Sequence, residues 1–562
     1  MSATYLGFDL SSSGLKCLAV TPDLKAVHEE SITFDQDLPS YGVSGGVLKN
    51  ETENEVYAPV AMWIEALDLL LQRMKDNGFD FSTVKGMSGA GQQHGSVYWS
   101  DKAEDLLKSL DPTKTLVDQL SPSAFTHPFS PNWQDHSTQP ECEQFETTSC
   151  SGDSLAHTTG SRAHHRFTGP QIKRFLRLRP EIYESTPRIS LVSSFLCSLF
   201  LGKIAPLDIS DVCGMNLWSI PTNSWDETLL ALTAEGSKDG AAGLKTKLGE
   251  VSQHPGENLG AISQFFVSRY GFTPSCIITP FTGDNPSTIL ALPLRPMDAI
   301  LSLGTSTTLL MVTETYKTSV EYHMFNHPTT RGLYMFMLCY CNGALAREEL
   351  KDTLNNGKGG DWSAFNQAAL SSPIAGKSTP SAPAKLGIYF PLPENIPNVR
   401  AGTWRFTYDG QSIKETSEGW NIPHDDARSI LESQALSMRL RSDPLLEEAG
   451  DKRQPRRLYV VGGGSKNEAI VEVMAQVLGA KEGVYRLDVG SNACALGAAY
   501  LAAWGGEAEG AAFEDWVQER WDESSMVKKI AEGYREGVWE TYGELVEGLR
   551  LVEKSIVGRA SN

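Results

Sequence analysis

Tyr5-Leu-Gly-Phe-Asp9-Leu-Ser-Ser-Ser-Gly14-Leu-Lys16 is the stretch that decides the fold of this chain, and it has a degenerate counterpart far along the sequence, Ile300-Leu-Ser-Leu-Gly304-Thr-Ser-Thr-Thr-Leu-Leu-Met-Val312. In both stretches an apolar strand enters a small hydroxyl-rich turn and leaves it as a second strand. We interpret the pair as duplicated hairpins in two similar halves that close on a phosphate group. Asp9 ends the first strand, whereas Ser302 stands at the corresponding place in the second. The halves therefore look alike in scaffold and different in chemistry.

The length and the charge of the chain limit its class. With 562 residues it exceeds what one hydrophobic core usually supports, so we expect two large domains. Its net charge of −20 would repel nucleic acid and anionic membrane surfaces, so neither is expected as a partner. Any basic site must be local, and the expected partners are small molecules. The sequence leaves open whether the protein is a monomer or a homodimer.

Cysteine usage and the N-terminus indicate a cytoplasmic protein. The 9 cysteines are scattered and odd in number, and none form pairs of zinc-finger spacing. The first residues lack the basic head and apolar core of a signal peptide. Residues 189–202 form the longest apolar run, but serines interrupt it and it is too short to span ~30 Å of hydrocarbon. We expect residues 188–201 to form a buried helix instead.

Strand and helix patterns alternate in the first half of the chain. Residues 5–9, 15–20 and 84–88 have strand character, and an amphipathic helix is expected over residues 60–74. This succession predicts a layered α/β domain that ends near residues 290–298. In the second half we expect a short helix over residues 362–370 and a hairpin that turns at Asp409-Gly410. The last fifty residues are expected to be a helical covering element.

A glycine-rich turn follows the strand at Leu458-Tyr-Val-Val461. Gly462, Gly463 and Gly464 lead into a predicted helix that begins with Ser465 and Glu468 in capping-box spacing. Glycines let a ligand approach the backbone, and free N–H groups at a helix start attract phosphate or the polar atoms of adenosine. The alternative is a tight strand-to-helix turn without a ligand. The turn lacks the lysine of a Walker loop.

The hairpin at Ser11, Ser12 and Ser13 offers N–H groups and hydroxyls to phosphate oxygens. Asp9 stands beside this turn and cannot bind phosphate directly, because both are negative. A carboxylate at that place suits Mg²⁺ or its bound waters as a ligand. The alternative is an aspartate that only caps the turn.

Two further clusters suit a polyhydroxylated ligand. Gly89-Ala-Gly91-Gln-Gln-His94-Gly95 follows a strand and combines backbone access with amide groups and an imidazole. Arg166, on the basic loop 161–169, is a candidate contact to a hydroxyl or a phosphate. For His94 the alternative is a structural histidine, and for Arg166 a solvated side chain.

Thr282-Gly283-Asp284-Asn285-Pro286 places a carboxylate in a turn at the end of a strand, near the expected domain boundary. Asp284 is well placed to accept a proton from a hydroxyl that attacks phosphorus, and Asn285 to hold the same ligand. The alternative is an Asp-Asn turn that precedes a helix.

Taken together, the chain resembles the FGGY family of carbohydrate kinases, within the actin, hexokinase and heat-shock ATPase superfamily, and in particular its eukaryotic xylulokinases. The motifs that carry the resemblance are Gly91-Gln-Gln-His94-Gly95, residues 161–169, residues 190–202, Arg269-Tyr-Gly-Phe272, residues 281–286 and Ser302-Leu-Gly-Thr-Ser306. The resemblance runs from residue 5 to about residue 503. It implies two actin-like, ribonuclease H-like α/β domains with a cleft between them. The implied domains are a sugar-binding domain over 1–293, a nucleotide-binding domain over 294–510 and a helical extension over 511–562.

The resemblance implies phosphoryl transfer from ATP, with Mg²⁺, to the terminal hydroxyl of D-xylulose. Asp284 would be the catalytic base, and the sugar would be held by His94, Arg166, Asp284 and Asn285. The nucleotide and its phosphates would be held by Ser11, Ser12, Ser13, Gly304, Thr305, Trp362, Gly463, Gly464 and Asn467. Asp9 would position Mg²⁺. Two departures from the family pattern are Ser11-Ser12, where Gly-Thr is usual, and Trp133-Gln134-Asp135, where bacterial members have Trp-Asn-Asp. A kinase for ribulose or glycerol, or an inactive sugar sensor, remains an alternative.

Overall fold

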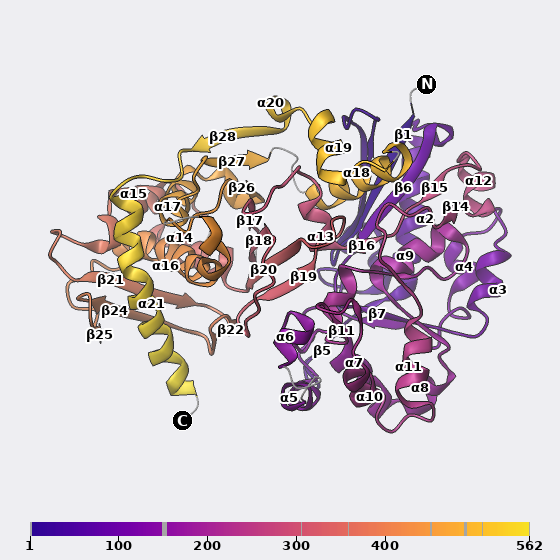
Figure 1. Ribbon diagram of the computed structural model, residues 1–562, viewed down its shortest axis with the longest axis horizontal. Coiled ribbons are helices and arrows are strands. Elements are labelled where there is room, and N and C mark those ends of the chain that lie inside the picture. The colour runs from indigo at the N-terminus through magenta and orange to yellow at the C-terminus, as the bar shows by residue number, and fades with distance from the viewer. Residues whose placement is uncertain are drawn as a thin grey trace. The chain divides into compact units, whose positions relative to one another are not determined.

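The computed structural model of the protein describes residues 3–148, 154–304, 306–357, 359–449, 452–487, 492–508 and 510–560. It is a mixed α/β structure that divides into two compact units (Figure 1). The first unit comprises Met1–Leu294, Thr318–Met335 and Asn492–Trp521, and the second comprises Arg295–Lys317, Phe336–Ser491 and Asp522–Asn562. This division differs from the expected domains, because two later segments pack with the first unit. Among the described residues, no helix combines the length and apolar character needed to cross a membrane.

A twisted sheet forms the centre of the first unit. Its strands lie in the order β14 (Gly260–Ala261), β15 (Ile277–Ile278), β6 (Val84–Gly91), β1 (Thr4–Leu10), β2 (Gly14–Val20) and β3 (Ala26–Thr33), and β16 (Thr282–Gly283) also pairs with β6. β1 and β2 form the expected antiparallel hairpin, whereas β1 and β16 run parallel to β6. Leu10 and Gly283 both lie opposite Gly91. The carboxyl ends of three strands therefore meet at one edge of the sheet.

Helices that pack on this sheet include α2 (Val60–Asp76), α9 (Val192–Leu201) and α18 (Ala493–Glu507). The apolar face of α2 is buried, as its helical periodicity predicts. α18 packs against β1 and β6, and the absence of a side chain at Gly7 allows this approach (Figure 1). A Cβ atom at Gly7 would lie 2.0 Å from the Ala495 carbonyl oxygen. This contact explains why the Asn492–Trp521 segment belongs to the first unit.

The apolar run that we expected to be one helix over residues 188–201 is in fact a strand followed by a helix. β9 (Arg188–Leu191) pairs with β7 (Ser96–Trp99) before α9 begins at Val192. The prediction of the helix was therefore wrong over its first turn. A short apolar run does not distinguish a buried strand from a buried helix, and here pairing with a distant strand decides between them.

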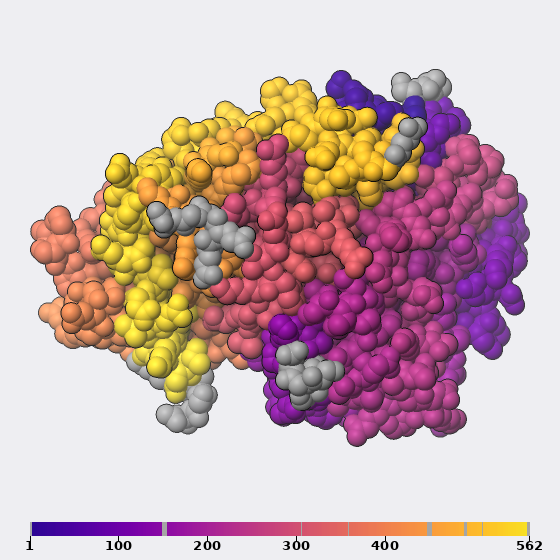
Figure 2. Space-filling model, in the orientation of Figure 1, coloured from indigo at the N-terminus to yellow at the C-terminus, as the bar shows by residue number. Residues whose placement is uncertain are grey.

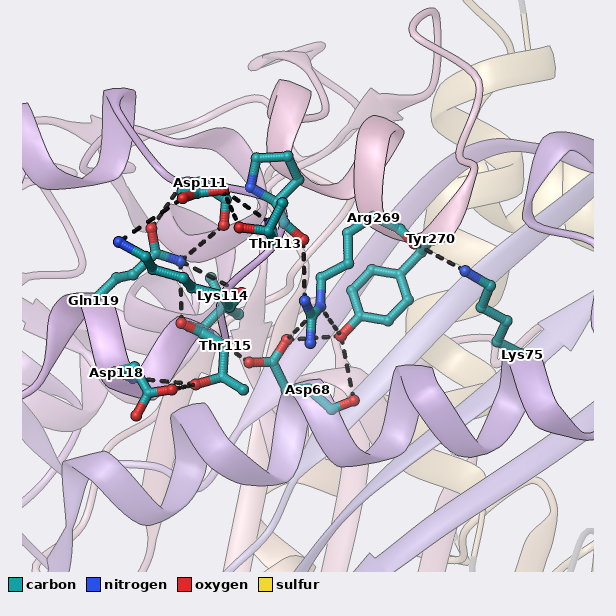
Figure 3. Close-up of polar contacts among 12 residues, drawn as sticks. Asp68, Lys75, Asp111, Thr113, Lys114, Thr115, Asp118, Gln119, Arg269 and Tyr270 are labelled. Carbon is teal, nitrogen blue, oxygen red and sulfur yellow. Dashed lines mark hydrogen bonds and ion pairs between the residues drawn. The ribbon is translucent and has the colours of Figure 1, made fainter.

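A polar cluster ties α12 (Gln264–Tyr270) to α2 and α4 (Leu116–Leu120) (Figure 3). The Tyr270 hydroxyl donates to Asp68 Oδ1 at 2.6 Å, and the Leu116 N–H donates to Asp68 Oδ2 at 2.5 Å. Arg269 lies 3.7 Å from the same carboxylate and donates to the Pro112 carbonyl at 3.0 Å. The Arg269-Tyr-Gly-Phe272 motif therefore joins structural elements in this unit.

The second unit has its own sheet, in the order β20 (Tyr334–Tyr340), β18 (Thr307–Thr313), β17 (Ala299–Leu303), β26 (Leu458–Val461), β27 (Val484–Leu487) and β28 (Val527–Ala531). Its helices include α14 (Gly343–Leu354), α15 (Ser363–Ser371), α16 (His424–Ser442), α17 (Glu468–Leu478) and α21 (Val538–Ala560). β17 and β18 form the second expected hairpin, and β24 (Gly402–Tyr408) pairs with β25 (Ile413–Glu415) as the Asp-Gly turn predicts.

The C-terminal segment is not a single helical element, so that prediction was wrong in part. α19 (Phe513–Arg520) belongs to the first unit, while β28 extends the sheet of the second. α21 then lies along the surface of the second unit, in yellow in Figure 2. Buried polar contacts hold it to α16: the Arg428 guanidinium donates to the Tyr542 hydroxyl at 2.8 Å, and Arg441 pairs with Glu553 at 2.8 Å.

Candidate functional site

The edge where β1, β6 and β16 end gathers most of the predicted sugar-site residues of the first unit. Asp9 lies one residue before the end of β1, Gln92 to His94 follow β6, and Asp284 follows β16 directly. The Gln92 N–H donates to the Leu10 carbonyl at 2.8 Å, which holds the two strand ends together. Parallel pairing thus brings together residues that are far apart in the sequence.

Asp284 begins the short helix α13 (Asp284–Ile289). Its Oδ1 accepts hydrogen bonds from the Asn285 backbone N–H at 2.8 Å and from the Asn285 side-chain amide at 3.0 Å. Burial, and secondly the nearby Asp9 carboxylate, raise the pKa of Asp284 to about 7. A carboxyl group with a pKa in this range can take up and release a proton near neutral pH, as a general base must.

Two buried aspartates that the sequence reasoning missed lie beside Asp284. Asp211 accepts a hydrogen bond from Ser193 at 2.5 Å, and burial, with the carboxylates of Asp208 and Asp284, raises its pKa to about 8. Asp208 accepts from Thr282 at 2.6 Å, and burial raises its pKa to about 6. The signal that could have revealed them is the presence of two charged residues within the mostly apolar stretch 207–215.

The side-chain amide of Asn285 is held from a second direction by Gln93. Asn285 Nδ2 donates to Gln93 Oε1 at 2.9 Å. Gly283 permits this crowding, since a Cβ there would lie 2.7 Å from Asp211 Oδ1 and 2.9 Å from Gln93 Nε2. Gln93, Asn285 and Asp284 therefore form a connected polar group.

His94 has a positive φ of 75°, an uncommon conformation for a residue other than glycine. Its Nδ1 lies 2.8 Å from the Gly214 carbonyl oxygen, and since a carbonyl only accepts, Nδ1 carries the proton. Burial lowers the pKa of His94 well below its ordinary value, and Arg166 lowers it further. The neutral imidazole is left with Nε2 as an acceptor for a ligand hydroxyl.

Arg166 lies in the same cluster of rings as His94. The His94 ring stacks on Phe167 with centroids 4.4 Å apart, and the Arg166 guanidinium carbon lies 5.6 Å from the Phe167 centroid. Arg166 Nη2 donates to His323 Nε2 at 3.1 Å. The sequence reasoning missed His323, which comes from a segment more than a hundred positions later than Arg166.

Asp9 is a buried carboxylate whose Oδ1 has no hydrogen-bond partner among the described residues. Burial raises its pKa, while Lys16, which lies opposite on β2, and the Cys494 thiol lower it. An unpaired buried carboxylate oxygen is well suited to coordinate a cation. The described residues contain no group of three His, Cys, Asp or Glu that could hold a metal ion.

The hydroxyls of Ser11 and Ser12 in the first hairpin turn are already engaged with the protein. Ser11 Oγ donates to the Gly14 carbonyl at 3.0 Å. Ser12 Oγ donates to Gln92 Oε1 at 3.3 Å and accepts from the Trp133 indole N–H at 2.7 Å. The turn is thus joined to the Gln92–His94 segment.

Asp135, whose role the sequence left open, accepts hydrogen bonds from three segments of the first unit. Its Oδ2 accepts from the Val56 N–H at 2.9 Å, and its Oδ1 accepts from Ser137 and from the Gln171 amide at 2.7 Å. These bonds give Asp135 a structural role in the first unit.

The second unit contains a cavity of about 780 Å³ that brings together five of the predicted nucleotide contacts. The five are Gly304, Trp362, Gly463, Gly464 and Asn467. A Cβ at Gly463 would meet no atom within 4 Å, so the glycine leaves open space there. Thr305, also predicted as a phosphate contact, lies outside the described residues.

The glycine turn enters α17 differently from the expected capping box. Ser465 lies in a 3₁₀ turn, Gly463–Lys466, where its hydroxyl donates to the Gly462 carbonyl at 2.7 Å. Asn467 caps α17 instead, and its Oδ1 accepts from the N–H groups of Ala469 and Ile470. The prediction of Ser465 as the cap was wrong because the extra turn moves the helix start to Glu468. Asn467 Nδ2 is bound to Asn366 Oδ1 at 2.8 Å.

Comparison with known proteins gives a family match and full-length relatives. Residues 299–506 match the C-terminal domain of the FGGY family of carbohydrate kinases. The chain is 56% identical over 562 residues to the probable D-xylulose kinase A of Neosartorya fischeri, an alignment that covers 98% of each chain. It is 55% identical to the D-xylulose kinase A of Aspergillus niger, again over 98% of each chain.

Solved structures share the fold at low sequence identity. A xylulose kinase from Rhodospirillum rubrum superposes with a TM-score of 0.77 at 16% identity and covers 100% of both chains. The Plasmodium falciparum glycerol kinase with ADP gives a TM-score of 0.72 at 15% identity and covers 100% of this chain and 98% of that one. These likenesses concern the fold alone, and they confirm the expected actin-like α/β fold of sugar kinases.

Proposed function

This chain belongs to the FGGY family of carbohydrate kinases, and we propose that it transfers the γ-phosphoryl group of ATP to the terminal hydroxyl of D-xylulose, forming D-xylulose 5-phosphate and ADP. The observation that carries the proposal is the 55% identity to D-xylulose kinase A of Aspergillus niger over 98% of each chain. The half-buried Asp284 at the meeting point of three strands supplies the chemistry that such a reaction needs.

Asp284 acts in this proposal as the general base. Its carboxylate accepts the proton of the sugar hydroxyl while the hydroxyl oxygen attacks the γ-phosphorus in line with the departing ADP. The pKa of about 7 suits this transfer, because a base is most effective when its pKa lies near the working pH. Asn285 holds the carboxylate through its amide and its backbone N–H.

His94, Arg166 and Asn285 hold the sugar. Nε2 of the neutral His94 accepts a hydrogen bond from a sugar hydroxyl, and the Arg166 guanidinium donates to sugar oxygens. Both N–H groups of the Asn285 amide are bound to Gln93 and Asp284, so Asn285 contributes its Oδ1 as an acceptor. Support for this division comes from the Nδ1 contact of His94 to Gly214, which leaves only Nε2 for the sugar. A ketose needs donors and acceptors together, and the three side chains supply both.

The nucleotide binds in the cavity of the second unit. Gly463 leaves room for the adenosine beside Trp362, Gly464 lines the same cavity, and Asn467 lies at the start of α17. The hairpin turns at Ser11–Ser13 and at Gly304 hold phosphate oxygens through backbone N–H groups. We propose Thr305, which follows Gly304 in the sequence, as a further phosphate contact.

Asp9 holds Mg²⁺, directly or through bound water. The unpaired Oδ1 supports this assignment, and when bound the ion neutralises charge on the phosphates. Lys16 lies opposite Asp9 and offsets part of its negative charge.

We also propose the cytoplasm as the compartment of this enzyme. All eight cysteines that the structure describes are free thiols, which fits a reducing environment.

A coupled ADP-release assay with D-xylulose, D-ribulose, glycerol and gluconate tests the proposed function. We expect D-xylulose to give the highest kcat/KM. Preference for another of these compounds would overturn the assignment of the sugar, and no ADP release with any of them would overturn the assignment as a kinase. Asp284→Ala should abolish transfer and still bind ATP, while the exposed Asp101→Ala serves as the matched control.

A further inference from the structure

His323 is a buried histidine that lies outside the sequence motifs and has no assigned role in the proposed reaction. It begins β19 (His323–Asn326) in the Thr318–Met335 segment of the first unit, and its side chain is almost inaccessible to solvent. A buried polar ring needs partners for both nitrogens, and His323 has them. Its Nδ1 lies 2.9 Å from Ser161 Oγ, and its Nε2 lies 3.1 Å from Arg166 Nη2.

The chemistry of these partners determines the tautomer of His323. A guanidinium group has only donors, so Nε2 must accept from Arg166. The proton therefore sits on Nδ1 and is donated to the Ser161 hydroxyl. Burial, together with the charge of Arg166, lowers the pKa of His323 well below its ordinary value and keeps the ring neutral. A protonated ring would lose the acceptor that Arg166 uses.

His323 also completes the platform beneath the sugar residues. The Phe167 ring, which is fully buried, lies 4.4 Å from the His94 centroid and 5.6 Å from the His323 centroid. The Arg166 guanidinium carbon lies 5.6 Å from the same ring. One aromatic ring thus contacts two of the predicted sugar ligands, His94 and Arg166, and the histidine that binds Arg166.

We propose that His323 is a positioning residue of the sugar site: by accepting one N–H of Arg166 and packing on Phe167, it fixes the direction in which the guanidinium meets the sugar. This inference rests on the proposed function, since it assumes that Arg166 contacts the sugar. His323 contributes to sugar affinity through Arg166 and has no contact with the reacting atoms. The Ser161 hydroxyl, which accepts from Nδ1, keeps the ring in the required orientation.

Steady-state kinetics with sugar and ATP varied separately test this proposal. His323→Leu removes the acceptor, and we expect it to raise the KM for the sugar about tenfold, the effect of losing one hydrogen bond to a charged group, with the KM for ATP unchanged. His323→Gln retains an acceptor near the position of Nε2 and should restore most of the affinity. His327→Gln, at another buried histidine of the same segment, is the matched control and should leave both KM values unchanged.

A double-mutant cycle with Arg166→Met distinguishes positioning from simple packing. If His323 acts through Arg166, His323→Leu should cause no further rise in the sugar KM once Arg166 is absent. Additive effects in the double variant, or an unchanged sugar KM in His323→Leu, would overturn the proposal. Should His323→Leu not fold, His323→Asn and His323→Gln replace it: the shorter amide reaches only the place of Nδ1, so only the glutamine should preserve the sugar KM.

The outcomes for the two proposals are separable. The sugar for which the unaltered protein releases ADP most efficiently is the probe in all variants. An unaltered protein that is active only with another sugar overturns the assignment of D-xylulose and leaves the His323 comparison intact. An unaltered protein that releases no ADP with any sugar overturns both.

Discussion

At the scale of single residues, the carboxyl group of Asp284 makes the pH dependence of the reaction predictable. As the proposed base, Asp284 must be deprotonated to react, and its pKa in the free protein is about 7. We therefore expect kcat/KM for the sugar to rise with pH and to reach half its plateau near pH 7, since this parameter reports the ionisation of the free enzyme. A pH profile of kcat/KM for the sugar measures the pH of this half-plateau. An acid limb at the ordinary pKa of an aspartate would contradict the raised pKa of Asp284.

Asp211 gives a second prediction at this scale, which concerns stability. Its pKa is about 8 in the folded protein against an ordinary 3.8, so the folded state holds this proton more tightly than the unfolded state. The resulting stabilisation is complete below the unfolded pKa and is lost as the pH rises through the folded pKa. Asp211→Asn cannot ionise, and it should increase the free energy of unfolding by ~0.5–2 kcal/mol in alkaline buffer.

The measurement for Asp211 is urea unfolding in mildly acidic and in alkaline buffer. The difference between Asp211→Asn and the unaltered protein should be larger in the alkaline buffer. Asp101→Asn, at an exposed position, is the control and should show no such difference. A gain in stability that appears only in the acidic buffer would show that the sign is wrong.

At the scale of secondary-structure elements, the Asp68 cluster joins α12, α2 and α4 (Figure 3). Tyr270→Phe removes the hydroxyl that donates to Asp68 and leaves a buried carboxylate with fewer partners. We expect a loss of about 1–3 kcal/mol in the free energy of unfolding, measured with urea. Tyr500→Phe is the matched control, because that buried hydroxyl lies 3.5 Å from its acceptor and its loss should matter less. Equal losses in both variants would argue against a special role for Asp68.

The glycine turn before α17 gives a second prediction at this scale. A methyl group at Gly463 meets no protein atom within 4 Å, yet the residue lines the cavity of the second unit. Gly463→Ala should therefore leave the unfolding temperature unchanged and raise the KM for ATP several-fold, while the KM for the sugar stays the same. At Gly464 a Cβ would lie 2.9 Å from Leu303 Cβ, so Gly464→Ala should also destabilise the protein. An unchanged KM for ATP in Gly463→Ala would place the nucleotide elsewhere.

At the scale of the whole molecule, each substrate is assigned to a different unit. Amide hydrogen exchange can test this division, because a ligand slows the opening of the structure that it binds. A non-hydrolysable ATP analogue should protect residues 458–478, and D-xylulose should protect residues 89–95 and 282–289. In the Gly463→Ala variant the ATP analogue should no longer protect residues 458–478, whereas the protection by D-xylulose should remain. Protection of residues 458–478 by the sugar alone would contradict the assignment.

Several elements were predictable because their signals are local. The β1–β2 hairpin, the amphipathic helix α2, the short helix α15 and the hairpin of β24 with β25 follow from apolar periodicity and turn residues. The prediction for β9 failed because a distant strand, β7, pairs with it. The start of α17 was predicted wrongly for a local reason: the Ser465 hydroxyl donates to the nearby Gly462 carbonyl inside a 3₁₀ turn that precedes the helix.

The sequence by itself determined the α/β class, the two hairpins with hydroxyl-rich turns and the identity of the residues at the strand ends, because period and turn chemistry act over a few neighbouring residues. Only the tertiary structure decided which residues surround them. Asp208 and Asp211 lie beside Asp284, His323 binds Arg166, and α18 packs on β1 against Gly7. These contacts join residues that are far apart along the chain, so they depend on how strands and helices pack rather than on any local pattern.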